Sequence, residues 1–209
     1  MIQRWDIVTI GNISRNRYWG ESDERAYRPA LCTCTAIAAG ACRLLVDPSV
    51  EDSATMAFEL DRRTGLKPGD IDLVFVTHSH GDHHRGLKHF ARAEWLAAEA
   101  VAEELNAAGR YERDILPAGR RIADDIDVIH APGHTLNLHV LRFDCEGRSV
   151  VIAGDAVMNR EFFQDRRGYY NSADFALAAE SIEKIARMAD TVVPGHDNYF
   201  LNDRRRSSP

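Results

Sequence analysis

The chain of 209 residues lacks any long hydrophobic run. None of its apolar stretches approaches the roughly 18 residues that a membrane-spanning helix needs. The N-terminal sequence Met1–Asp6 opens no apolar stretch either, so no signal peptide is indicated. We therefore expect a cytoplasmic protein that has no part in the membrane.

Cysteine is also scarce, with only Cys32, Cys34, Cys42 and Cys145 in the chain. Cys32 and Cys34 are two residues apart in an apolar run, so on a strand their side chains point to the same face. They do not form a C-x-x-C pair. We expect buried, small hydrophobic side chains in a reducing compartment rather than a disulfide or a metal site.

An excess of basic residues is missing as well, since the formal net charge is −6 and the isoelectric point is about 5.8. This balance disfavours a surface made for general nucleic-acid binding. The length and the 44% hydrophobic content suit one globular domain, which needs no disulfides to be stable. With no repeat or linker in sight, we predict a single domain over residues 1–201 and a frayed C-terminal tail over 202–209.

The periodicity of apolar residues predicts strands that alternate with a few helices. The stretch Asp72–Thr77 is nearly all apolar and is typical of a central strand covered on both faces. The polar, arginine-rich stretch Asn12–Pro29 is predicted to be a long loop. Strands are expected at 5–13, 31–39, 42–47, 72–77, 126–130, 138–143, 149–153 and 191–193, and helices at 51–64, 97–108 and 172–189.

Four of the predicted strands end in histidine or aspartate. The run Thr77–His83 reads Thr-His-Ser-His-Gly-Asp-His, and three later strand ends carry Pro-Gly-His134, Gly-Asp155 and Pro-Gly-His196. Loops at the strand ends on one edge of a sandwich can converge in space. The sequence therefore predicts that these side chains meet in one site.

The clustered histidines predict a metal site. His78 and His80 are two residues apart and project to one side of an extended segment, whereas Asp82 and His83 lie past the turn at Gly81 and can serve a neighbouring ion. Imidazole suits zinc, iron, nickel or copper, and carboxylate suits a bridging position. Two ions need about seven donors. The candidates reach that number: His78, His80, Asp82, His83, His134, Asp155 and His196.

These motifs resemble, in order and spacing, those of the metallo-β-lactamase-fold hydrolases over about residues 31–196. The sequence Leu44–Asp47 is similar to the family's early strand that ends in aspartate. The resemblance implies an α/β fold, a four-layer α/β/β/α sandwich with mixed sheets. It also implies two divalent metal ions, zinc first and iron or manganese as alternatives. His78, His80 and His134 would hold one ion, Asp82, His83 and His196 the other, and Asp155 would bridge them.

A hydrolase function follows from this resemblance. Two cations lower the pKa of a shared water, and the resulting hydroxide attacks a small ester, thioester or lactone. Asp82 is the catalytic candidate, because it can orient the attacking water or shuttle its proton. The chain departs from common family residues at Arg85, at Asn137–Leu138 and at Asp197, none of which removes a ligand. These departures leave the substrate open.

Two other enzyme classes compete with the ester hydrolase. One is a mononuclear iron oxidoreductase of the persulfide dioxygenase type, in which one iron would be held by residues corresponding to His78, His134 and Asp155. The other is a phosphodiesterase or nuclease on the same fold, which the negative net charge disfavours. A non-catalytic binding protein is a third hypothesis, and a full set of ligands argues against it.

The residues that contact the substrate are the least determined part of the prediction. The segment 160–170 combines aromatic residues with arginine, which suits a pocket wall, a clamp for an anionic substrate or a contact in a homodimer. The candidates for contacts with a small-molecule substrate are Trp19, Tyr169 and Arg166. For His84 and His139 we expect positions outside the metal site.

Overall fold

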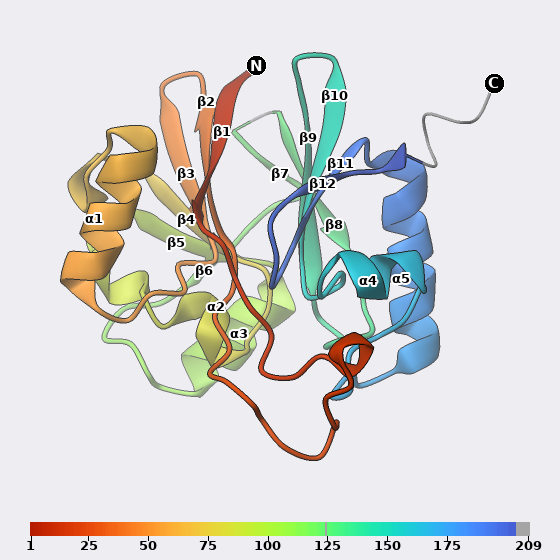
Figure 1. Ribbon diagram of the computed structural model, residues 1–209. Helices are drawn as coiled ribbons and strands as arrows, with labels where there is room; N and C mark the ends of the chain where they lie inside the picture. The colour runs from red at the N-terminus through yellow and green to blue at the C-terminus, as the bar shows by residue number, and fades with distance from the viewer. Residues whose placement is uncertain (124, 204–209) are drawn as a thin grey trace.

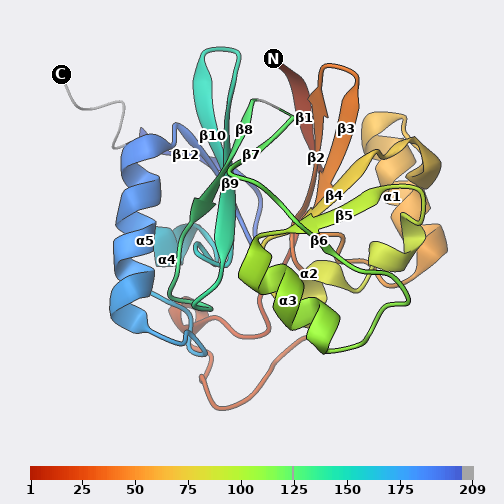
Figure 2. The ribbon, with the colours of Figure 1, turned by 180° about the vertical axis from the view of Figure 1, so that it is seen from behind.

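The computed structural model describes residues 1–123 and 125–203, which form two β-sheets between two layers of helices (Figure 1). Helices α1 (Ser53–Thr64) and α3 (Glu99–Ala107) cover the outer face of the first sheet. Helix α5 (Phe175–Met188) covers the outer face of the second sheet, as the view from behind also shows (Figure 2). The predicted four-layer α/β/β/α sandwich is confirmed.

The first sheet is mixed, with six strands in the order β1-β2-β3-β4-β5-β6 within the described residues. Strands β1 to β3 are antiparallel, and β3 to β6 are parallel. The bounds are Ile2–Thr9 for β1, Cys34–Ala39 for β2, Cys42–Val46 for β3, Leu73–Val76 for β4, Glu94–Ala97 for β5 and Leu116–Pro117 for β6. The parallel strands β4 and β5 are central, which explains the nearly continuous apolar sequence of β4.

The second sheet is also mixed, in the order β12-β11-β10-β9-β8-β7. Among the strands that the structure describes in this sheet, only the pair β10 and β11 is parallel, and α5 lies in the crossover between them. The bounds are Arg121–Ile122 for β7, Ile126–His130 for β8, His139–Cys145 for β9, Arg148–Gly154 for β10, Thr191–Pro194 for β11 and Phe200–Leu201 for β12. Two mixed sheets are what the sequence predicted.

Local capping fixes where the long helices begin and end. Asp52 accepts a hydrogen bond from the backbone N–H of Thr55 and starts α1, and Gly65 ends it in the left-handed conformation. Helix α5 begins three residues later than predicted, because Asp174 takes the N-cap and accepts from the N–H groups of Ala176 and Leu177. Two short helices, α2 (Gly81–His84) and α4 (Arg160–Gln164), were not predicted from periodicity.

The remaining differences from prediction are at strand ends and in very short strands. The first strand was expected over 5–13 but ends at Thr9, because the chain then leaves the sheet and Asn12 pairs with Leu31 in an isolated bridge. The expected helix over 97–108 begins inside the missed strand β5, which ends at Ala97. Strands β6, β7 and β12 have two residues each, too few for an alternating pattern to show.

The hydrophobic core has three layers, one between the sheets and one under each helical layer. Between the sheets, Leu44 and Phe75 pack against Leu141 and Val193. All four side chains are fully or nearly fully buried. Burying such side chains contributes roughly 1.5–3 kcal/mol each, so the packed sheets form a rigid base for the loops at their ends.

At the C-terminus, Asn202 does not behave as part of a frayed tail. Its side chain is buried and donates hydrogen bonds to the carbonyl oxygens of Ala186 (2.7 Å) and Ala189 (2.9 Å). Residues 204–209 of the predicted tail lie outside the described residues. No helix in the described part of the chain is long and apolar enough to cross a membrane.

Candidate metal centre

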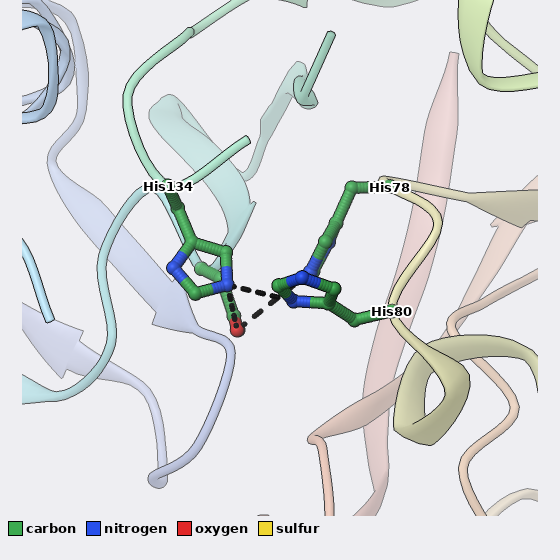
Figure 3. A group of neighbouring side chains, drawn as sticks. His78, His80 and His134 are labelled. Atoms are coloured by element: carbon green, nitrogen blue, oxygen red, sulfur yellow. Dashed lines mark hydrogen bonds and ion pairs between the residues drawn. The ribbon is translucent and has the colours of Figure 1, made fainter. Parts of the chain in front are cut away.

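All seven predicted metal ligands lie at one end of the two sheets. Each follows a strand, with β4 in the first sheet and the other three strands in the second: His78, His80, Asp82 and His83 after β4, His134 after β8, Asp155 after β10 and His196 after β11. Figure 3 shows His78 and His80 from the first half of the sandwich pointing toward His134 from the second. The site therefore lies where the two halves meet.

A first group of ligand atoms is formed by His78, His80, His134 and Asp155, all within 4.8 Å of one another. The Nε2 of His134 lies 2.9 Å from Nδ1 of His80 and 3.2 Å from Oδ2 of Asp155. The Nε2 of His78 lies 3.7 Å from the same carboxylate oxygen. Three imidazoles and one carboxylate thus point to one place, the donor set of a zinc-like ion.

A second group of ligand atoms is formed by Asp82, His83 and His196. The Nε2 of His196 lies 3.5 Å from Oδ2 of Asp82. The other oxygen of Asp155, Oδ1, is 3.2 Å from Nε2 of His83 and 3.3 Å from Nε2 of His196. Asp155 therefore turns one oxygen toward each group, which is how a carboxylate that bridges two cations must be placed.

The electrostatics of the two groups also fit a cation. The Nε2 atoms of His78 and His83 and Oδ1 of Asp155 are buried and make no hydrogen bond. Burial lowers the pKa of His78 and lowers that of His134 to about 4, so both imidazoles keep a free lone pair. Burial acts to raise the pKa of Asp155, but the surrounding histidines, His196 foremost, outweigh it and hold the carboxylate ionised. A divalent ion would satisfy these atoms together.

Asp47 supports the second group from behind. Its side chain is buried, and Oδ2 lies 2.9 Å from Nδ1 of His83, which leaves Nε2 of that ring to face Asp155. It also accepts hydrogen bonds from the backbone N–H and the hydroxyl of Thr77, each at 2.8 Å. A carboxylate behind a ligand histidine fixes the tautomer and raises the basicity of the ring. The sequence indicated Asp47 by its place at the end of an apolar strand. It did not predict the contact with His83.

Backbone carbonyls support His196 in the same way. Its Nδ1 donates to the carbonyl oxygens of Asn12 (3.0 Å) and Leu31 (2.9 Å), the two residues that close the base of the N-terminal loop. This contact directs Nε2 toward Asp82 and Asp155. No side-chain pattern could have indicated it, because carbonyl oxygens belong to every residue.

At two glycines in the motifs, Gly195 and Gly154, there is no room for a side chain. A Cβ on Gly195 would lie 1.9 Å from Oδ1 of Asp155, so a side chain there would displace the bridging carboxylate. Gly154 has a φ of +50°, and a Cβ on it would lie 2.7 Å from the hydroxyl of Thr77. Both glycines let the strands of the second sheet approach the loop after β4 closely enough to share ligands.

A cavity of about 280 Å³ opens above the ligands. The N-terminal loop contributes Ile13, Ser14 and Ala30 to its wall, and the segment before α5 contributes the stretch 169–171. His80, Gly81, Asp82, His134, Asp155 and His196 form the floor. The volume and the mixed lining suit a small molecule.

Tyr169 lines this cavity, as the sequence suggested for a substrate contact. Its hydroxyl, however, is used inside the protein. It donates to the carbonyl of Arg15 (2.8 Å) and lies within hydrogen-bond distance of the N–H of Arg15 and the hydroxyl of Ser14. The hydroxyl of Tyr169 is therefore engaged within the protein, and its ring is left to line the cavity.

The two other substrate candidates lie farther from the cavity floor. The indole N–H of Trp19 donates to Glu161, and the residue is 63% exposed beside a second cavity that shares His196 with the first. Arg166 pairs with Glu183 on α5 at 2.7 Å and does not line the cavity above the ligands. Arg166 therefore contacts helix α5 and not the cavity.

Two further histidines, His84 and His139, lie outside the two groups of ligand atoms. His84 is buried against Tyr111, 2.5 Å from its hydroxyl, and His139, the first residue of β9, bonds the carbonyl of Asn137. Cys32 and Cys34 are buried and free. Although Cys32 lies near Asp47 and His83, burial raises its pKa to about 12, so it stays a neutral thiol.

The fold and the donor set define a metal-binding protein of one well-known class. The chain belongs to the metallo-beta-lactamase superfamily, whose family model matches residues 27–196. Its site is built for divalent metal ions, and the protein is a metal-dependent hydrolase.

Individual relatives give points of comparison. A metallo-beta-lactamase domain-containing protein 1 of Xenopus laevis is 30% identical over 169 residues, which cover 77% of this chain and 69% of the relative. A Thermotoga maritima structure assigned to the metallo-beta-lactamases superposes with a TM-score of 0.72 at 19% identity, over 96% of this chain and 99% of that one. An N-acyl homoserine lactone hydrolase, with the product N-hexanoyl-L-homoserine at its catalytic metal centre, gives a TM-score of 0.71 at 18% identity, over 100% and 97% of the two chains. At these identities the structural likeness establishes the fold.

Proposed function

We propose that this protein hydrolyses a small ester, thioester or lactone with two zinc ions. The observation that carries the proposal is the carboxylate of Asp155, with Oδ2 beside His134 and Oδ1 beside His83 and His196. A site for a single ion needs no second group of ligands. Here Asp82, His83 and His196 form one of their own.

The donor set fits zinc in both groups. His78, His80 and His134 would hold one ion, Asp82, His83 and His196 the other, and Asp155 both. When bound, two such ions lower the pKa of water and polarise the oxygen of the scissile carbonyl. Imidazole nitrogen with one or two carboxylates is the ordinary protein environment of zinc, and iron or manganese would accept the same ligands.

Asp82 has the catalytic role among the chain's own residues. Its Oδ2 lies 3.5 Å from Nε2 of His196, and Asp82 also lines the cavity above the ligands. From there it can orient the attacking water and hold the proton that the water releases. Asp155 differs, because it is 6% exposed and its two oxygens face ligand nitrogens.

The cavity supports a small acyl substrate. Its volume is about 280 Å³, and Ile13, Met158 and Tyr169 add apolar surface to its lining. The lactone hydrolase that shares the fold binds the product N-hexanoyl-L-homoserine, an acyl compound, at its catalytic metal centre. A phosphodiester of nucleic acid would need a longer basic groove.

The test is metal analysis of purified protein combined with a screen of ester, thioester and lactone substrates. Asp155→Ala should lose both metals and lower kcat/KM by about 1,000-fold or more, since the water is no longer activated. His89→Ala is the matched control, because this half-buried histidine belongs to neither group of ligand atoms and its ring bonds the carbonyl of Glu51. One iron per chain with oxygen consumption, or full turnover by Asp155→Ala, would contradict the proposal.

A further inference from the structure

Arg110 brings a positive charge to the edge of the metal cavity. It follows α3 and is exposed. Its Nη1 lies 3.6 Å from the place that a Cβ on Gly81 would take. Gly81 stands between the ligands His80 and Asp82 and lines the cavity, whereas Arg110 itself does not line it. Because glycine has no side chain, the guanidinium of Arg110 lies beside the backbone of Gly81, at the edge of the cavity.

The backbone next to Arg110 is anchored to the helix that carries ligands. The hydroxyl of Tyr111 lies 2.5 Å from Nδ1 of His84 and donates to the carbonyl of His84 at 2.7 Å. The ring of Tyr111 packs edge-to-face on Trp95, with the ring centroids 5.4 Å apart, in the range typical of such pairs. These contacts tie residue 111 to α2, so Arg110 extends from a fixed point.

The guanidinium of Arg110 makes no hydrogen bond or ion pair with any residue between 1 and 123 or 125 and 203. Other arginines near the cavity are engaged. Arg15 donates to the carbonyl of Asp23 at 2.5 Å and stacks on Tyr170 at 4.0 Å, and Arg28 pairs with Glu21. Arg110 therefore differs from them in having its full donor fork available.

The lining of the cavity also has an apolar part. It includes Tyr169, Tyr170, Met158 and Ile13. A substrate in the cavity would meet this apolar surface as well as the single positive charge beside Gly81. One guanidinium balances one negative charge, which matches a carboxylate better than a phosphate with its charge near −2.

We propose that Arg110 binds a free carboxylate on the substrate, so that the enzyme selects esters, thioesters or lactones that carry a carboxylate beyond the scissile carbonyl. This inference rests on the proposed hydrolase function. Arg110 is a residue for substrate specificity and touches no reacting atom.

The test compares charged and neutral substrates of matched length on the metal-loaded full chain. The 4-nitrophenyl hemi-esters of succinate, glutarate and adipate are paired with the 4-nitrophenyl esters of the corresponding monocarboxylic acids. Arg110→Gln should lower kcat/KM for the best hemi-ester by about 10- to 100-fold, mainly through KM, and leave the neutral ester unchanged. Arg110→Lys should recover part of the loss, because it restores the charge without the fork. Arg120→Gln, an exposed arginine on another loop, is the control.

A binding measurement separates this inference from the proposed function. Titration calorimetry should show that glutarate binds the metal-loaded protein more tightly than butyrate, and that Arg110→Gln removes the difference. If no ester is hydrolysed but this difference is present, the proposed function is wrong and the role of Arg110 stands. If esters are hydrolysed and Arg110→Gln affects charged and neutral substrates alike, or neither of them, the role of Arg110 is overturned.

Discussion

The two halves of the metal centre are supported differently by the protein around them. Behind the second group, Asp47 holds His83 and two backbone carbonyls hold His196. In the first group, the Nδ1 of His134 is buried and makes no hydrogen bond. This difference indicates that the protein itself fixes the positions of the second group, whereas the first group depends more on the metal to set its geometry.

The chain achieves this with segments that are distant in sequence. Asp47 directly follows β3, and the carbonyls of Asn12 and Leu31 close the N-terminal loop, while the rings they support follow β4 and β11. In the first group, the Nδ1 of His78 has the hydroxyl of Thr77 beside it, at 3.1 Å. We therefore expect changes behind the ligands to affect the second metal selectively.

Asp47→Ala should have the largest effect on this comparison. It removes the carboxylate that contacts His83 and leaves the buried N–H and hydroxyl of Thr77 without their acceptor. Breaking such a buried pair costs about 3–5 kcal/mol of unfolding free energy. Affinity for the second metal should fall about 10- to 100-fold, with the first metal retained. Chemical denaturation and metal titration measure the two effects.

The control for this variant is Asp61→Ala, which removes an exposed carboxylate from α1. It should leave both metal sites intact and change the stability by no more than about 0.5 kcal/mol. Equal loss of both metals in Asp47→Ala would remove the distinction between the two groups.

Asp47 also shows how far the sequence could lead. The seven candidate ligands were recognisable because histidine and aspartate follow apolar strands, and β4, β8, β10 and β11 do end at one place. The contact of Asp47 with His83 depends on the pairing of β3 with β4, which a single sequence does not reveal. The carbonyl contacts of His196 have no signature in the sequence at all.

The fold divides in the same manner. Strands such as β8 and β9 show a clear pattern and were predicted within a residue or so at their starts. The missed strand β5 has only four residues and runs into a helix-forming segment rich in alanine and glutamate. Short elements are ordered by their neighbours in the sheet, and their own residues give little indication of it.

The pH dependence of the metal-free protein should separate the halves next. Burial lowers the pKa of His134 to about 4, whereas Asp155 raises the pKa of His196 against the effect of burial. The stability from His134 is complete above pH 6.5 and is lost as the pH falls toward 4. The stability from His196 is complete below pH 6.5 and is lost as the pH rises past its folded pKa.

The metal-free protein should therefore be most stable near pH 6.5, and His134 alone should account for a loss of up to about 3 kcal/mol on the acid side. Denaturation at a series of pH values after chelation measures this curve, and metal-loaded protein should give a flatter curve around neutral pH. His134→Ala should flatten the acid side selectively. A stability that rises steadily from pH 4 to pH 9 would speak against opposite contributions from the two groups.

Tyr169→Phe should have the smallest effect of these changes. It should act on the second group of ligands through the N-terminal loop. The lost hydroxyl bonds the backbone of Arg15, in the loop whose ends at Asn12 and Leu31 hold His196. We expect a loss of about 1 kcal/mol in stability and a correspondingly small loss of affinity for the second metal. Tyr199→Phe is the control, since this exposed ring packs on Trp5 away from the ligands. If Tyr169→Phe weakened the first metal more than the second, the loop would not be the support of His196, and the ring of Tyr169 would instead act through the cavity that it lines.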